Sequence, residues 1–313
     1  MPKLPYQFVA ITALIPTLIV SGTQAETPEA FTNKQLNEQS LMAVNWVQQS
    51  GEYRALVYQA FNIGKIIFDT AKTKNISRPA VIVDIDETVL DNSPYQAGLF
   101  DTNNGFELQS WNKWLKAAKA KAVPGSVEFV NYVNSNGGKV FFISNRDAKS
   151  TKDGKINDLE AATINNLKSV GFTGVNEQTV LLRGEFSKVI NGKENNSKQW
   201  RLDAINNGIA DGNKHTIVAF VGDSLNDFDE AAGRNNQQRR DYVDKNRNSY
   251  GVFDITNAGM IQPAYIAIPN PMYGNWEIGM YDPKPFNKQT TLEMTPGERS
   301  QQRKESLNRW LAD

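Results

Sequence analysis

The sequence has 313 residues, of which 40% are hydrophobic and 22% are charged, an ordinary globular composition that allows one large core or two modest ones. Its 34 lysines and arginines balance its 34 aspartates and glutamates, so net charge does not favour nucleic acid or an anionic membrane surface as a partner. There is no cysteine, which excludes disulfides, thiolate metal sites and a lipid-modified cysteine. A small-molecule substrate is therefore the better expectation.

The first 25 residues have the pattern of an export signal peptide. Lys3 supplies a positive charge, residues 8–20 (FVAITALIPTLIV) form an apolar run, and small residues precede a cleavage position after Ala25. The run contains Pro16 and is shorter than the ~20 residues that a membrane-spanning helix needs. We expect cleavage there and a periplasmic or secreted protein; retention of the segment as a membrane anchor is the alternative.

Predicted helices and strands alternate along the rest of the chain. Residues 32–73 have apolar side chains at helical spacing and predict two helices, and further helices are predicted over 124–135 and 158–170. Four short runs rich in β-branched residues predict buried strands, at residues 78–86, 138–146, 179–184 and 215–224. The alternation predicts right-handed βαβ units in an α/β fold with a doubly wound parallel sheet.

Three of these strands end in polar groups. The first ends in DIDET, with Asp84 and Asp86, the second in SNR, with Ser144, and a later one in GDSLND, with Asp223 and Asp227. The carboxyl ends of parallel strands lie along one edge of the sheet, so the three clusters are expected to converge there. So many carboxylates need a compensating cation, and oxygen ligands without cysteine or a nearby histidine favour Mg²⁺.

Other reaction types lack their required residues. His215 is the only histidine and precedes a predicted strand, which excludes histidine-dependent phosphatases and Ser-His-Asp hydrolysis. Neither G-x-x-x-x-G-K-[ST] nor G-x-G-x-x-G occurs, so a P-loop nucleotidase and a dinucleotide oxidoreductase are disfavoured.

The order D-x-D-E-T, Ser, Lys and G-D-x-x-x-D resembles the haloacid dehalogenase superfamily. Longer segments, among them VDIDETVLDNSPYQ, GFTGVNEQTVLLR, SKQWR and IPNPMYGNWEIGM, resemble the exported class C (DDDD) acid phosphatases, including the lipoprotein e type 5′-nucleotidases. The similarity runs from about Trp46 to Met280. It implies a Rossmann-like core at about 76–240 and a small, mostly helical cap from 30–75 and 241–313, within one acid phosphatase domain at 26–313.

The resemblance also implies a role for each acidic residue. Asp84 would be the nucleophile that forms an aspartyl-phosphate, and it would bind Mg²⁺. Asp86 would be the general acid and then the general base, with its backbone carbonyl on the metal. Asp223 would bind Mg²⁺ directly, and Asp227 would bind it directly or orient a metal-bound water or the catalytic lysine.

Ser144 and Lys198 are implied to bind the phosphoryl oxygens. Residues 184–196 form a longer segment than we expect of the family, so Lys188 and Lys193 are alternatives. SKQWR favours Lys198 because it keeps the family pattern S-K-x-x-R.

Aromatic residues in two segments suggest the substrate. Trp111 and Trp114 are spaced i, i+3 on a predicted helix, for which packing on the core is the plain alternative. In the family an aromatic pair sandwiches a nucleoside base, and the resemblance implies that Trp111 and Tyr273 would occupy those positions. This implies 5′-nucleoside monophosphates, including nicotinamide mononucleotide, as substrates. A sugar-phosphate phosphatase and an inactive exported nucleotide-binding protein are the alternatives, and the family suggests a homodimer.

Overall fold

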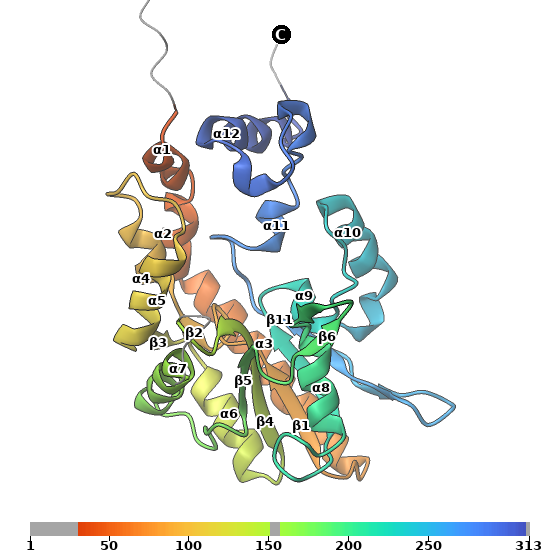
Figure 1. Ribbon diagram of the computed structural model, residues 1–313. Helices are drawn as coiled ribbons and strands as arrows, with labels where there is room; N and C mark the ends of the chain where they lie inside the picture. The colour runs from red at the N-terminus through yellow and green to blue at the C-terminus, as the bar shows by residue number, and fades with distance from the viewer. Residues whose placement is uncertain (1–30, 151–156, 311–313) are drawn as a thin grey trace, which may run out of the picture. The chain divides into compact units, whose positions relative to one another are not determined.

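Five parallel strands form the central sheet, in the order β11-β8-β1-β4-β5 (Figure 1). Their bounds are Pro79–Val83 for β1, Lys139–Asp147 for β4, Val180–Arg183 for β5, Thr216–Gly222 for β8 and Ala264–Ala267 for β11. From β1 the chain proceeds to β4 and β5 on one side and to β8 and β11 on the other, so the strand order reverses at β1. The predicted parallel α/β fold is confirmed, and four of the five strands coincide with predicted runs.

The computed structural model describes residues 31–150 and 157–310, which belong to one unit beginning at Phe31. The predicted signal peptide and its cleavage position lie outside the described residues. In the part of the chain that is described, no helix has both the length and the apolar character required to cross a membrane.

Both faces of the sheet are buried. In β1, Val81 and Val83 belong to one apolar cluster, whereas Ala80 and Ile82 belong to a second cluster on the other face. All five β1 residues are buried, which explains why its sequence is apolar throughout instead of alternating.

Helices supply the partners for these two faces. On the Val81 face lie α3 (Gly51–Thr73), α6 (Ser126–Ser135) and α7 (Asp158–Ser169), each of which contributes buried apolar residues to the first cluster. On the opposite face, α8 (Lys198–Asn206) contributes Ala204 and Ile205 to the second cluster. The sheet is therefore the middle layer of three.

The remaining elements lie outside the sheet. The α-helices are α1 (Asn33–Glu38), α2 (Leu41–Gln49), α4 (Ser93–Gly98), α5 (Leu108–Ala117), α9 (Leu225–Phe228), α10 (Asn236–Lys245), α11 (Asn275–Ile278) and α12 (Pro296–Glu305). The antiparallel pairs are β2 (Leu90–Asp91) with β3 (Lys121–Ala122), β6 (Lys188–Ile190) with β7 (Lys193–Asn195), and β9 (Asp254–Ile255) with β10 (Ile261–Gln262).

Residues 32–73 form three helices where two were predicted. The break before α3 is at Ser50, whose backbone is extended and whose side chain accepts a hydrogen bond from the Tyr53 amide. This is a helix N-cap, which starts a new helix even though apolar residues continue on both sides.

The two segments predicted to form the cap each contribute one element to the core: α3 packs on the sheet, and β11 is one of its strands. Helix α3 packs against β1, β8 and β11, with Val57 and Phe68 fully buried. Strand β11 comes from the segment after residue 240 and pairs with β8. The predicted boundaries at 75 and 241 therefore do not separate cap from sheet. At the first boundary, the reason is that α3 is a long amphipathic helix, which needs the sheet to bury its apolar side.

Candidate active site

Three carboxylates from distant parts of the sequence meet at the carboxyl edge of the sheet. Asp84 follows β1, Asp223 follows β8, and Asp227 lies on α9. Each offers an oxygen within 4.8 Å of those of the other two. The structure thus brings together three of the four predicted acidic residues through their side chains.

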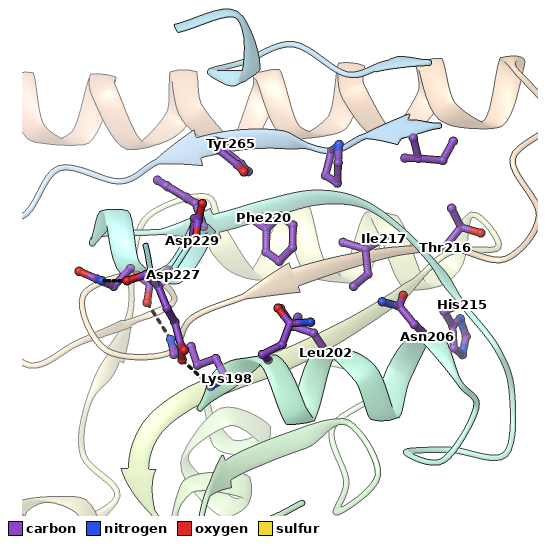
Figure 2. A pocket seen from close by; sticks show the side chains of 16 residues that line it. Lys198, Leu202, Asn206, His215, Thr216, Ile217, Phe220, Asp227, Asp229 and Tyr265 are labelled. Carbon is purple, nitrogen blue, oxygen red and sulfur yellow. Dashed lines mark hydrogen bonds and ion pairs between the residues drawn. The ribbon is translucent and has the colours of Figure 1, made fainter. Parts of the chain in front are cut away.

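Lys198 is the cation of this cluster. Its Nζ donates to Asp84 Oδ1 at 2.8 Å, to Asp227 Oδ1 at 2.7 Å and to the Ile143 carbonyl at 3.2 Å. Figure 2 shows Lys198 at the start of α8 and its ion pair with Asp227. Ser197 caps this helix by accepting from the Gln199 amide, which fixes the start of the helix that carries the lysine.

The two other candidate lysines lie elsewhere. Lys188 and Lys193 are exposed on β6 and β7, and Lys188 Nζ lies 3.8 Å from the centroid of the Trp200 ring. Of the three lysines, Lys198 is the one whose ammonium group contacts Asp84.

Burial and repulsion from neighbouring carboxylates make Asp84 and Asp223 hard to ionise. Burial raises the pKa of Asp84 to about 7; Lys198 opposes this shift, and Asp227 adds to it. Burial, then repulsion from Asp227 and Asp84, raises the pKa of Asp223 well above its ordinary value. Burial lowers the pKa of Lys198, but Asp227 and Asp84 outweigh it and raise that pKa. One ammonium group therefore faces more negative charge than it can balance.

The cluster fits a hard divalent cation such as Mg²⁺. All three side chains offer carboxylate oxygens, which Mg²⁺ prefers. Asp227 already accepts from Lys198 through Oδ1 and from the Ser224 amide through Oδ2. Asp84 uses Oδ1 for Lys198, and Asp223 accepts from Asn270 Nδ2 at 2.8 Å through Oδ2. Asp84 and Asp223 thus have the freer oxygens, and Asp227 holds the lysine.

The side chain of Asp86 has different partners. Its Oδ1 accepts from Arg146 Nη2 at 2.7 Å, and from Asn92 Nδ2 at 2.8 Å. Its side chain is not among the three clustered carboxylates, which suits the expectation that only its backbone carbonyl binds metal. Sequence reasoning missed both partners, although Asn92 lies within VDIDETVLDNSPYQ and Arg146 is the last residue of SNR.

Ser144 is buried in β4, near the acidic cluster. Its hydroxyl accepts from the Arg146 amide at 3.1 Å, which leaves the hydroxyl hydrogen able to donate. Its carbonyl accepts from Arg201 Nη1 at 2.6 Å. Burial lowers the pKa of Arg201 to about 10. Sequence reasoning also missed this buried arginine, although it is the last residue of the SKQWR segment that resembles the family.

The two predicted base-binding aromatics have separate surroundings. Trp111, on α5, lies edge-on to Tyr95 at 5.1 Å and near Phe106 at 6.1 Å between ring centroids. The hydroxyl of Tyr273 donates to the carboxylate of Glu87. Among the described residues, the rings of Trp111 and Tyr273 are not in contact. The aromatic neighbours of Trp111 are therefore Tyr95 and Phe106, and its pairing with Tyr273 around a base stays a prediction.

His215 lies away from the acidic cluster. A groove of about 650 Å³ runs between α8, β8 and β11, with Lys198 and Asp227 at one end and His215 at the other (Figure 2). His215 Nε2 pairs with Asp211 Oδ2 at 3.0 Å. This position agrees with the exclusion of histidine chemistry, and the groove touches the acidic cluster only at its Lys198 end.

Comparison with known proteins identifies the family. The model for the HAD superfamily, subfamily IIIB (acid phosphatase), matches residues 18–276. Two solved structures of the class C acid phosphatase from Bacillus anthracis, one of them with tungstate bound, are 32% identical in sequence. Each match covers 88% of this chain and 99% of the other, with TM-scores of 0.71 and 0.70. The chain therefore belongs to the class C acid phosphatases of the haloacid dehalogenase (HAD) superfamily, and it is a phosphomonoesterase.

Proposed function

We propose that this phosphatase is exported, depends on Mg²⁺ and hydrolyses 5′-nucleoside monophosphates, including nicotinamide mononucleotide, through an aspartyl-phosphate on Asp84. The observation that carries the proposal is the position of Asp84, which contacts Lys198 and lies within 4.8 Å of Asp223 and Asp227. A buried carboxylate beside a single ammonium group and two further carboxylates suits a nucleophile that works next to a divalent cation.

In the first step, an oxygen of Asp84 bonds to phosphorus while the bond from phosphorus to the ester oxygen breaks. Asp86 gives its proton to the departing oxygen. Lys198 and the Ser144 hydroxyl stabilise the charge on the phosphoryl oxygens. Mg²⁺, when bound, would reduce the repulsion between the Asp84 carboxylate and the phosphate dianion.

In the second step, water bonds to phosphorus and the bond between phosphorus and Asp84 breaks. Asp86 accepts the proton of the attacking water, so it returns to its starting protonation state. Asp227 keeps Lys198 in place through both steps, supported by their 2.7 Å ion pair.

The aromatic residues near Trp111 support a substrate with a base. Trp111, Tyr95 and Phe106 form a cluster on α4, α5 and the loop between them, and Phe106 is 64% exposed. Stacking on such rings accepts any purine or pyrimidine. Tyr273 as the second wall of the base site remains a prediction, and so do the signal peptide and the homodimer.

A substrate panel tests the proposal. Purified protein at mildly acid pH should release phosphate from AMP and nicotinamide mononucleotide faster than from glucose 6-phosphate. EDTA should abolish the activity and Mg²⁺ should restore it, and Asp84→Asn should be inactive with every substrate. Trp111→Ala should lower kcat/KM for AMP by about tenfold, the value of one stacked base, and leave glucose 6-phosphate unaffected.

Three results would contradict parts of the proposal separately. Full activity in EDTA would exclude the metal requirement. Faster hydrolysis of glucose 6-phosphate than of AMP would favour the sugar-phosphate alternative. An equal loss with both substrates in Trp111→Ala would mean that Trp111 supports the fold and does not bind a base.

A further inference from the structure

We propose that Arg146 and Asn92 are positioning residues that anchor Oδ1 of Asp86, so that Oδ2 is the oxygen that carries the transferred proton. The inference rests on the proposed function, in which Asp86 is the general acid and base.

The two oxygens of Asp86 have unequal numbers of partners. Oδ1 accepts from Arg146 Nη2 at 2.7 Å, Arg146 Nε at 3.0 Å and Asn92 Nδ2 at 2.8 Å. Within the described part of the chain, Oδ2 accepts only a second, longer contact from Arg146 Nε at 3.1 Å. Three donors fill the lone pairs of Oδ1, so a proton there would displace one of them. Oδ2 has room for the proton.

The exposure of the two side chains agrees with these separate roles for Asp86 and Arg146. The Asp86 side chain is 21% exposed, whereas the Arg146 side chain is 2% exposed. The carboxylate can therefore reach a bound ester while the guanidinium behind it stays shielded from water.

Arg146 is itself held in place. It lies near the end of β4, and its Nη1 donates to Thr163 Oγ1 on α7 at 3.1 Å. A planar guanidinium bound on two sides has little freedom to rotate, so it fixes the carboxylate plane of Asp86 as well.

The orientation of the Asn92 amide is fixed by its neighbours. Its Oδ1 accepts from Trp114 Nε1 at 2.8 Å, and its Nδ2 donates to Asp86 and, at 3.2 Å, to Glu87 Oε2. An indole nitrogen can only donate, and a carboxylate placed as an acceptor needs a donor, so the reversed amide would lose these bonds. Trp114, on α5, therefore acts on Asp86 through Asn92.

The proton transfers follow from this geometry. The Oδ2–H bond of Asp86 breaks as its proton moves to the ester oxygen, which leaves phosphorus with its bonding electrons while Asp84 bonds to phosphorus. In the second step Oδ2 takes a proton from water as the water oxygen bonds to phosphorus and the Asp84–phosphorus bond breaks. Misplacing Asp86 should slow the first step only when the leaving group needs that proton.

Leaving-group dependence of kcat/KM tests the inference. The substrates are phenyl, p-nitrophenyl and 2,4-dinitrophenyl phosphate, whose leaving groups need a proton progressively less. Arg146→Gln should lower kcat/KM by about 100-fold for phenyl phosphate and by less than about threefold for 2,4-dinitrophenyl phosphate. Trp114→Phe removes the indole N–H and should show the same trend, with a loss of about fivefold for phenyl phosphate.

Arg183→Gln is the matched control. Arg183 pairs with Asp147 through Nε at 2.6 Å and Nη2 at 2.8 Å, the same two-nitrogen contact, but on a more exposed part of β5. Its three kcat/KM values should stay within about twofold of wild type. If Arg146→Gln does not fold, Trp114→Phe and Arg146→Lys carry the test, and guanidinium should restore phenyl phosphate hydrolysis in Arg146→Ala.

The outcomes separate this inference from the proposed function. An equal loss on all three substrates in both Arg146→Gln and Trp114→Phe would overturn the inference and leave the phosphatase mechanism intact. An equal loss in Asp86→Asn would overturn the general-acid assignment, and the inference with it. A lack of phosphate release by the wild-type protein with Mg²⁺ would overturn the proposed function itself.

Discussion

At the scale of single residues, replacing Lys198 should lower both activity and stability. Lys198→Met leaves Asp84 and Asp227 without their buried cation, so it should lower kcat/KM by at least about 100-fold. Loss of one partner of a buried ion pair should also lower the free energy of unfolding by about 3 kcal/mol at pH 7 without metal. Phosphate release and urea unfolding measure the two effects.

The matched control for Lys198→Met is Lys188→Met. Lys188 is exposed and contacts the Trp200 ring, so its loss should change the free energy of unfolding by less than about 0.5 kcal/mol and leave activity unchanged. Inactive Lys188→Met together with active Lys198→Met would show that the phosphate-binding lysine had been assigned wrongly.

A second residue-scale prediction concerns pH and Glu185, which lies outside the site. Burial raises its pKa to about 7, although the Leu182 amide opposes the shift. The folded protein therefore holds this proton more tightly than the unfolded chain does, so the contribution of Glu185 is greatest below about pH 4.5 and is lost as pH rises through 7.

Glu185→Gln should remove that loss. Between pH 4.5 and pH 7.5, the free energy of unfolding of the variant relative to wild type should rise by about 1 kcal/mol, after allowance for the partial exposure of the side chain. Urea unfolding of both proteins at the two pH values measures the change. A difference that stays constant with pH, or that falls as pH rises, would contradict it.

The sequence predicts some site residues better than others. Asp84, Asp223 and Asp227 follow strand ends, where the topology of a parallel sheet brings groups together, so the sequence alone predicts their clustering. The contact between Arg146 and Asp86 depends on side-chain orientation across 60 positions of sequence, which neither composition nor periodicity specifies. The neighbours of Trp111 depend on loop conformation for the same reason.

At the scale of elements, a small substitution can test the close contact between α3 and α6. A Cβ on Gly64 of α3 would lie 2.7 Å from Phe129 Cε2, and the Phe129 ring is fully buried. Gly64→Ala gains helix propensity but crowds this ring, so it should lower the free energy of unfolding by about 1–2 kcal/mol.

Gly98→Ala at the end of α4 is the control for that substitution. Its Cβ would meet no atom of the described residues within 4 Å, so the same change should stabilise the protein by up to about 1 kcal/mol. Thermal unfolding of both variants compares them. Equal stabilisation by both would mean that α3 and α6 are less tightly packed than the structure has them.

Element prediction succeeded where local pattern and burial agree. The strands β1, β4 and β8 are long apolar runs that need two covered faces, and the sequence identifies them directly. Strand β11 is four residues at a sheet edge, with Tyr265 and Ala267 not fully buried, so no long run marks it. Its place was therefore missed, and with it the extent of the sheet.

At the scale of the whole molecule, metal binding should stabilise the fold. The crowding of Asp84, Asp223 and Asp227 opposes folding when no cation is present, because burial and repulsion raise the pKa of Asp84 and Asp223. Mg²⁺ at about 100 times its Kd should add about 2.7 kcal/mol to the free energy of unfolding. Thermal unfolding should then show a Tm higher by roughly 5 °C than in EDTA.

Asp223→Asn tests whether that stabilisation comes from this cluster. The variant should lose most of the Mg²⁺-induced rise in Tm, and NaCl at matched ionic strength should not produce the rise in wild type. A rise of the same size in wild type and Asp223→Asn would place the metal elsewhere in the protein.

The most direct test of the central claim is acid quenching during turnover, followed by peptide mass spectrometry. We predict that wild-type protein with Mg²⁺ and p-nitrophenyl phosphate carries one phosphoryl group on the peptide containing Asp84, and that Asp84→Asn and EDTA-treated protein carry none. A phosphoryl group on another residue, or wild-type turnover by Asp84→Asn, would contradict the account.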